Sequence, residues 1–242
     1  MTGRILAGLV ATACVGALAV APAGASGPPV ATYAVTIENL TDGQPFTPPV
    51  IATHRAATDM FTVGQPASFE IKEIAENGNL GPMIALLDSD KHVFDSADAM
   101  APLVPSGLPS SGMFDDSVTL TVTAGTGAKF LSFASMLICT NDGFTGVDSL
   151  RLPKKIGEQI AVTTSGYDAG TEVNTENYAD IVPPCQGLHG VNVEPGTGMS
   201  NPALAEGGVI HHHSGIQGGV DLTPMTHGWH DPVAEVTVER VS

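Results

Sequence analysis

Two acidic turns carry the side chains best suited to hold a metal ion. Residues 140–143 read Thr-Asn-Asp-Gly and follow an apolar run, and residues 167–172 read Tyr-Asp-Ala-Gly-Thr-Glu. The carboxylates of Asp168 and Glu172 stand on either side of Gly170, a spacing that lets one turn direct both toward one point. Ca²⁺ binds several oxygen ligands in a flexible geometry. Asp142, Asp168 and Glu172 are therefore candidate calcium ligands, and the alternative is that they are ordinary solvated loop acids.

The histidines form a second candidate site. On a strand, His211 and His213 would share one face, and His227 or His230 would add a third nitrogen ligand for zinc or copper. Such a site could activate a water molecule. The alternative is a solvated or hydrogen-bonded loop, because the spacing fixes no tetrahedral ligand set. A zinc or copper metalloenzyme acting on a small or glycan substrate is thus kept as an alternative function.

No other sequence pattern points to catalysis. The chain contains no nucleophile elbow, Walker loop, dinucleotide-binding fingerprint or zincin helix. We therefore expect a protein that acts by binding and is not an enzyme. The only tryptophan, Trp229, precedes the last predicted strand, and we expect it to seal the edge of the core, with an exposed ligand platform as the alternative.

The N-terminus predicts export. Arg4 precedes an apolar run from residue 5 to 21 and an Ala-Gly-Ala site at 23–25, which is typical of a secretory signal peptide at residues 1–25. A retained membrane anchor is the alternative. Cys14 would leave with the cleaved segment. We expect a secreted, periplasmic or surface protein with no transmembrane anchor after cleavage.

The mature chain is strongly acidic. Cleavage removes Arg4 and no acid, so eight Lys and Arg remain against 25 Asp and Glu, a net charge of −17. An acidic surface repels phosphate backbones and attracts cations and basic partners. Nucleic acid is therefore excluded as a partner.

Two cysteines remain after cleavage, Cys139 and Cys185. Because the chain is bound for an oxidising compartment, we expect them to form a disulfide. The alternatives are two buried free thiols or a cysteine nucleophile, and export disfavours the reduced thiolate that a nucleophile needs.

The elements that must position these residues are predicted to be strands. With 28 Gly, 18 Pro and only 14% charged residues, the composition favours many turns between short strands in one domain. Alternating apolar residues predict strands at 32–40, 117–123 and 233–241, and a more apolar run predicts a central strand at 129–138. A turn at 124–127 is expected to join the second and the central strand as a hairpin.

Helix and loop signals are few. One short helix is expected at 66–76, ending at Asn77-Gly78, and residues 187–219 are interpreted as a long surface loop. A further acidic stretch is interpreted as a solvated loop; it contains Asp88, Asp90, Asp95 and Asp98. The predicted layout is a signal peptide at 1–25, a linker at 26–31 and one β-sandwich domain at 32–242.

Several motifs, in this order along the chain, resemble the spondin domain of F-spondin and mindin in a bacterial single-domain form. The resemblance covers roughly residues 33–241. Its motifs are Val-Thr-Ile-Glu-Asn-Leu-Thr at 35–41, Ala-Thr-His at 52–54, Ala-Ser-Met at 134–136 with Thr-Asn-Asp at 140–142, the acidic turn at 167–172, and His-Gly-Trp at 227–229 with Pro-Val-Ala at 232–234.

The resemblance implies an all-β, antiparallel β-sandwich similar to C2 domains, with long loops and at most a short helix. It also implies a calcium ion held by loop carboxylates at the positions of Asp142, Asp168 and Glu172, the last by an Asp-to-Glu change. The expected function is a calcium-binding recognition or adhesion module whose partner is a protein or glycan at the cell surface or in the matrix. A purely structural envelope or matrix protein is the remaining alternative.

Overall fold

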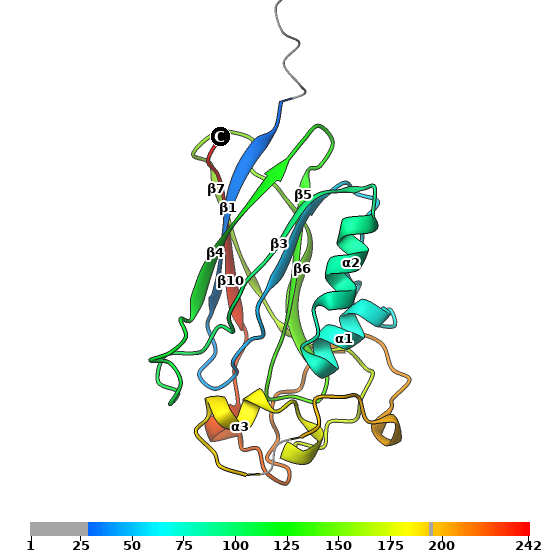
Figure 1. The fold of residues 1–242 in the computed structure, drawn as a ribbon, viewed down its shortest axis with the longest axis vertical. Coiled ribbons are helices and arrows are strands. Elements are labelled where there is room, and N and C mark those ends of the chain that lie inside the picture. The colour runs from blue at the N-terminus through cyan, green and yellow to red at the C-terminus, as the bar shows by residue number, and fades with distance from the viewer. Residues whose placement is uncertain (1–28, 194–195) are drawn as a thin grey trace, which may run out of the picture.

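Two antiparallel sheets pack face to face as a β-sandwich, which confirms the predicted fold class (Figure 1). The structure is a computed structural model that describes residues 29–193 and 196–242. The predicted signal peptide, with Cys14, and residues 26–28 of the predicted linker lie outside these residues. The smaller sheet has the strand order β4-β1-β10-β7, and the larger has the order β3-β2-β5-β6-β8-β9. The strands are β1 (Ala31–Asn39), β2 (Val50–His54), β3 (Val93–Asp98), β4 (Ser117–Ala124), β5 (Phe130–Met136), β6 (Gly143–Arg151), β7 (Gln159–Thr164), β8 (Gly166–Asp168), β9 (His211–His212) and β10 (Ala234–Arg240).

The first and last strands are neighbours in the four-stranded sheet. β1 and β10 pair antiparallel, with Val35 opposite Val238 and Ile37 opposite Val236. Both strands bury every second residue, because their sheet packs on one face only. The alternation in the sequence therefore predicted these two strands correctly.

The six-stranded sheet is covered on both faces. Its inner face packs Ile51, Leu131 and Phe133 against the β1 and β10 side chains, and its outer face packs Ala134 and Met136 against helices. A sheet buried on both faces needs nearly continuous apolar strands. This explains why β5 is mostly apolar and why all its residues after Phe130 are buried, and it confirms the prediction that this strand is central.

Two helices, α1 (Phe69–Asn77) and α2 (Gly81–Ser89), cover the outer face of the larger sheet (Figure 1). The Ser68 hydroxyl caps the start of α1 by accepting a hydrogen bond from the Ile71 amide, and Gly78 ends it in the left-handed conformation. This helix and its end were predicted. Helix α2 was not, and the solvated loop expected from Asp88 to Asp98 is wrong, because α2 and β3 occupy it. Short helices α3 (Pro184–Leu188) and α4 (Pro224–His227) and two 3-10 turns, Tyr178–Asp180 and Pro202–Leu204, follow in the loops.

The hairpin predicted between β4 and β5 is also wrong, because these strands belong to different sheets. β4 pairs with β1, and β5 pairs with β2 and β6. At this edge the Asp95 carboxylate of β3 accepts hydrogen bonds from the Thr123 amide (2.7 Å) and hydroxyl (2.6 Å). A side chain thus joins the two sheets where backbone pairing stops, and the turn at 124–127 carries the chain across.

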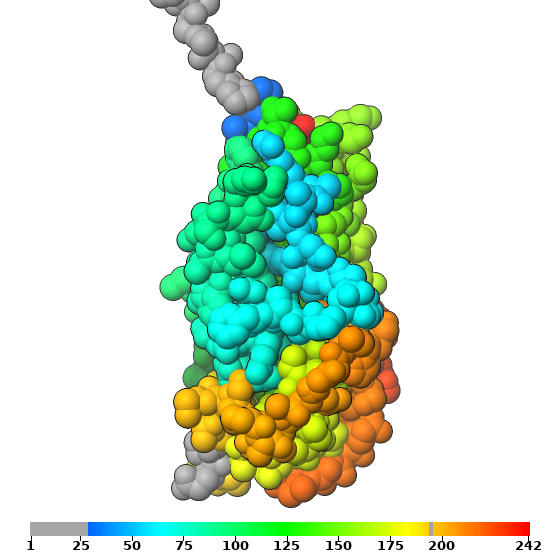
Figure 2. Space-filling model, turned by 90° about the vertical axis from the view of Figure 1, so that its right-hand side faces the viewer, coloured from blue at the N-terminus to red at the C-terminus, as the bar shows by residue number. Residues whose placement is uncertain are grey.

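Residues 137–142, 166–193 and 196–233 gather at the end of the sandwich opposite the start of β1 and the end of β10 (Figure 1). In Figure 2 the orange segment of this loop region lies directly beneath the cyan segment that contains α1. Backbone hydrogen bonds join the two, from the Gly64 amide to the Ile210 carbonyl and from the Ile210 amide to the Gln65 carbonyl. The predicted long loop at 187–219 is therefore tied to the sandwich. In the described parts of the chain no helix has the length and apolarity needed to cross a membrane.

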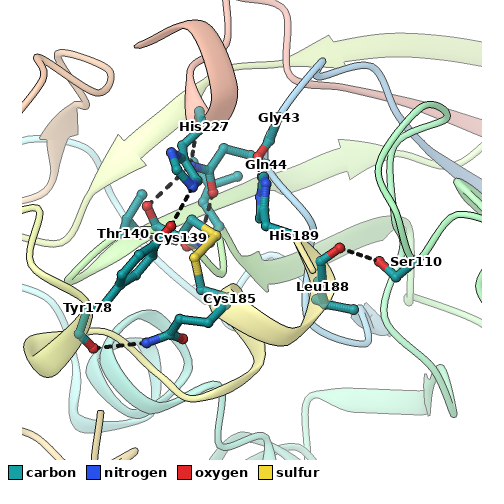
Figure 3. The surroundings of a disulfide bond; sticks show 12 residues. Gly43, Gln44, Ser110, Cys139, Thr140, Tyr178, Cys185, Leu188, His189 and His227 are labelled. Atoms are coloured by element: carbon teal, nitrogen blue, oxygen red, sulfur yellow. Dashed lines mark hydrogen bonds between the residues drawn. A yellow bond between two sulfur atoms is a disulfide. The ribbon is translucent and has the colours of Figure 1, made fainter. Parts of the chain in front are cut away.

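A disulfide between Cys139 and Cys185 anchors these loops, as predicted (Figure 3). It joins the turn after β5 to helix α3, with both residues fully buried. The Gln44 side chain brackets Cys139, accepting from its amide at 3.0 Å and donating to its carbonyl at 3.2 Å. The disulfide and this amide clamp hold the turn that ends in Asp142.

A buried histidine pair lies beside the disulfide. His189 and His227 have ring centroids 4.4 Å apart, and His189 donates from Nε2 to the Gly43 carbonyl (3.1 Å) (Figure 3). Burial, together with the charge of His227, lowers the pKa of His189 to about 4. His189 is therefore neutral at pH 7, burial also lowers the pKa of His227, and the pair acts as a hydrogen-bonded packing element.

Removal of the disulfide should destabilise the fold markedly. Its two cysteines are separated by 46 positions, and closing such a loop stabilises a folded chain by about 4 kcal/mol in the loop-entropy model. We expect Cys139→Ala/Cys185→Ala to lower the free energy of unfolding by that amount in urea titrations followed by circular dichroism. Reduced wild-type protein should behave alike. A loss below about 1 kcal/mol in both would mean that other contacts hold the turn.

Candidate metal centre

The two acidic turns meet because β6 pairs with β8. Asp142 directly precedes β6, Asp168 is the last residue of β8, and Gly143 stands opposite Asp168 in the pairing register. The Ala169 amide donates to the Asp142 carbonyl at 3.1 Å. The sheet therefore brings the first predicted ligand beside the second.

The Asp142 carboxylate joins the turns directly. Its Oδ2 accepts hydrogen bonds from the Thr171 amide (2.7 Å), the Thr171 hydroxyl (3.2 Å) and the Glu172 amide (3.0 Å). Its Oδ1 is buried and has no hydrogen-bond partner among the described residues. A buried oxygen without a donor is costly unless a cation or a proton satisfies it.

The other two carboxylates are also buried. Asp168 accepts from the Gly170 amide (2.7 Å) at Oδ1 and from the Asn174 side chain (2.6 Å) at Oδ2. Glu172 accepts from the Asn201 amide (3.0 Å) at Oε1. No Lys or Arg within residues 29–193 and 196–242 forms an ion pair with Asp142, Asp168 or Glu172.

Burial raises the pKa of two of the three groups. Burial, aided by the charge of Asp168, raises the pKa of Asp142 to about 6. Burial also raises the pKa of Glu172 to about 7, with further contributions from Glu76, Asp142 and Asp180. Both pKa values rise because a negative charge is buried without a positive partner. A bound cation would remove this cause.

The three carboxylates share one region but do not point at one spot in this conformation. In the described part of the chain, the only three His, Cys, Asp or Glu side chains with ligand atoms all within 4.8 Å of one another are those of Cys139, Cys185 and His189. Two of these atoms are the sulfurs of the disulfide, so they are not thiolate ligands. The donor types suit calcium, and coordination by all three carboxylates requires a side-chain rotation.

Sequence reasoning missed Glu76, a fourth buried acid in this region. It lies near the end of α1, its side chain is 2% exposed, and its nearest cation is Lys72 at 3.8 Å. Its Oε2 has no hydrogen-bond partner among the described residues. Only the packing of α1 over the site reveals it, because Glu76 looks like any surface acid of an amphipathic helix.

Two further residues that were not among the candidate ligands join the site to the next loop. Asn141 accepts at Oδ1 from the Thr175 amide (3.0 Å) and the Glu176 amide (3.4 Å). The buried Glu176 carboxylate in turn accepts from the amides of Gln217 (2.5 Å), Gly218 (2.8 Å) and Gly219. A continuous hydrogen-bonded path therefore links the turn at Asp142 to the loop at 217–219.

The structure does not assemble the candidate histidine site. His211 is exposed, and its Nδ1 lies 2.9 Å from the Val209 carbonyl, whereas His227 is buried and bonded to Tyr178. His230 is exposed in the turn before β10. His213 packs against Trp229, with ring centroids 5.0 Å apart. Among the described residues no three imidazoles bring their nitrogens within 4.8 Å of one another.

Trp229 packs against the core, as expected, and also lines a pocket. It is partly buried and packs against the hydrophobic clusters on both faces of the larger sheet. Its free edge lines a pocket of about 330 Å³ with side chains from three loops. The pocket is lined by Asp42, Ser214, Gly215, Ile216, Gln217, Pro224, Met225, Gly228, Trp229 and His230.

The fold and the site define a class, a disulfide-linked β-sandwich with a cluster of buried acids in the loops at one end. The Spondin_N family model matches residues 40–181. The match covers more than half of the chain and includes both acidic turns, so the chain belongs to the spondin N-terminal domain family. No curated protein shows a significant match to it. Family membership and the disulfide support an extracellular protein of the recognition or adhesion type.

Gly170 should be indispensable to the second turn. It has φ +67°, and an added Cβ would lie 2.6 Å from the Val209 amide nitrogen, so a side chain meets both strain and backbone. Gly157 is a matched control, with φ +77° and open space around it. We expect Gly157→Ala to lower the free energy of unfolding by about 1 kcal/mol and Gly170→Ala by about 3 kcal/mol or more. Equal losses of the free energy of unfolding in urea titrations would show that the second turn accommodates a side chain at position 170.

Proposed function

We propose that this protein is an extracellular recognition module in which Ca²⁺ joins the two acidic turns, and that it acts by binding and not by catalysis. The observation that carries the proposal is the buried, unpartnered Oδ1 of Asp142 beside two further buried carboxylates. Calcium fits these donors, since it takes carboxylate oxygens in a flexible geometry and neutralises charges that otherwise repel.

Asp142, Asp168 and Glu172 would hold the ion. Asp142 already contacts the second turn through Oδ2, which leaves Oδ1 as a ligand. Glu172 has one oxygen on the Asn201 amide and a longer side chain that can reach inward. When bound, the ion supplies positive charge that offsets the repulsion among the acids. The chain's own contribution is to position these oxygens and to exclude water from them.

The recognition surface that we propose is the rim around the Trp229 pocket. The path from Asn141 through Glu176 to Gln217 connects the metal centre to the loop that lines this pocket. Ordering the turns should therefore order the rim. An aromatic edge, an exposed methionine and nearby polar groups suit a protein or glycan ligand.

Calcium should stabilise the protein against heat. Binding to the folded state alone adds about 2.7 kcal/mol at a calcium concentration of 100 Kd, which raises Tm by roughly 5–10 °C for a domain of this size. We expect this shift in differential scanning calorimetry of chelator-stripped protein, and EDTA should reverse it. An unchanged Tm would refute the metal assignment.

The variant Asp142→Asn separates loss of the ion from loss of the fold. The asparagine Oδ1 can keep the hydrogen bonds of the second turn, while its amide replaces the unpartnered oxygen and removes a buried charge. In EDTA this variant should be at least as stable as the wild type, yet calcium should not shift its Tm. Asp88→Asn, at an exposed position of α2, should keep the full calcium shift.

The rim can be tested with two matched methionines. Met225 is 93% exposed and lines the Trp229 pocket, whereas Met100 is 95% exposed and lies elsewhere. On a panel of purified surface polysaccharides and matrix proteins, we expect calcium-dependent binding to at least one member. Met225→Ala should weaken that binding by about fivefold because apolar contact is lost.

Met100→Ala should leave the affinity unchanged. If both methionine variants bind like the wild type in surface plasmon resonance, the rim is not the contact surface. If binding persists in EDTA, calcium does not control recognition even where it stabilises the fold.

A further inference from the structure

The cationic side chains gather at the end of the sandwich opposite the metal centre. Of the nine Lys and Arg in this acidic chain, four line a single pocket of about 260 Å³ at that end. β6 runs from the metal centre at Gly143 to this pocket at Arg151, a span of roughly 25–30 Å. The pocket is lined by Tyr33, Ala128, Lys129, Arg151, Leu152, Pro153, Lys154 and Arg240.

The pocket contains no acidic side chain, although Asp and Glu outnumber Lys and Arg by 25 to nine in the whole chain. Glu158, an acid four residues after Lys154, accepts at Oε2 from the backbone amides of Lys154 and Lys155 at 2.8 Å each. This acid therefore caps a turn and does not line the pocket. Arg55 adds positive charge nearby, because its side chain lies next to Gly127.

Parts of the pocket are held in place. The Arg240 guanidinium donates from Nε to the Ser242 carbonyl at 2.8 Å and from Nη1 to the Lys154 carbonyl. Arg151 lies over the Phe130 ring, 5.2 Å from its centroid. The buried Tyr33 hydroxyl donates to the Pro153 carbonyl at 3.3 Å. Two guanidinium groups are thus positioned, while Lys129 and Lys154 are exposed residues.

We propose that this pocket binds a phosphate group. Its volume lies below the ~300–1,000 Å³ of pockets for drug-sized ligands, so it suits one small group. Guanidinium and ammonium donors that line one pocket match the oxygens and the double charge of a phosphate. Exposed aliphatic side chains at this end, Val30, Ile156 and Val241, are what a phospholipid headgroup surface would contact.

The first experiment uses inorganic phosphate as the probe. We expect saturable binding in isothermal titration calorimetry at constant ionic strength, with chloride as the reference anion. Lys129→Gln and Lys154→Gln should each weaken it about tenfold, because each removes a charge-assisted hydrogen bond. Lys91→Gln removes the same charge at an exposed position outside the pocket and should change the affinity less than about twofold.

The second experiment distinguishes the source of the phosphate. Vesicles of phosphatidylglycerol with phosphatidylcholine are compared with pure phosphatidylcholine vesicles in a co-sedimentation assay. Binding to the anionic vesicles that Lys129→Gln weakens and Lys91→Gln does not assigns the phosphate to a lipid headgroup, whereas binding of the free ion alone assigns it to a soluble ligand.

Two outcomes overturn the proposal. One is no binding of either probe, and the other is an equal loss in Lys91→Gln and the pocket variants, which reflects the general field of the protein. EDTA should not affect phosphate binding, since the metal centre lies at the far end of β6, so this test and the calcium test can fail independently.

Discussion

The acidic end of the molecule depends on the carboxylate of Asp142. One of its oxygens accepts three hydrogen bonds from the second turn, and the other is buried with no partner among the described residues. Through the first oxygen, the polypeptide joins the two turns without any ion. The second gives that contact an electrostatic penalty, because a carboxylate out of water needs a positive charge or a proton. The proposed ion would therefore add to a contact between the two turns that the chain already makes.

The loops around this junction are held by polar contacts as well as by buried apolar side chains such as Ile181, Ile210 and Leu222. The Glu176 carboxylate binds three successive backbone amides of the loop at 217–219, and the Gln44 amide group brackets Cys139. The disulfide joins the same turn to α3. Directed hydrogen bonds and a covalent link thus add to the apolar burial that restricts these long loops. Ligand-binding positions on such loops can therefore be as well defined as positions on strands.

The sequence predicts those features whose causes lie within a few neighbouring residues. The alternation in β1 and β10, the apolar run of β5, and the glycine that ends α1 are local signals, and the strands and helix they predict are present. Asp95 shows why other predictions failed. Its carboxylate binds Thr123 across the edge of the sandwich, so an acid that looks solvated is a link between sheets. The hairpin of β4 and β5 failed for a related reason, since no local pattern says which sheet a strand joins.

The residues of the candidate site show the same difference between local signals and long-range packing. The turns that hold Asp142, Asp168 and Glu172 are recognisable in the sequence by their glycines and spacing. Glu76 and Glu176 belong to the site only through packing.

Net charge likewise conceals the distribution of charge. A value of −16 describes the chain as uniformly acidic, yet four of its nine Lys and Arg line one pocket at the end away from the buried acids. The pairing of β1 with β10 and the course of β6 place these residues together, although they come from distant parts of the chain. The fold therefore places a cluster of buried acids at one end of the sandwich and a cationic pocket at the other, and the two proposed ligands carry opposite charges.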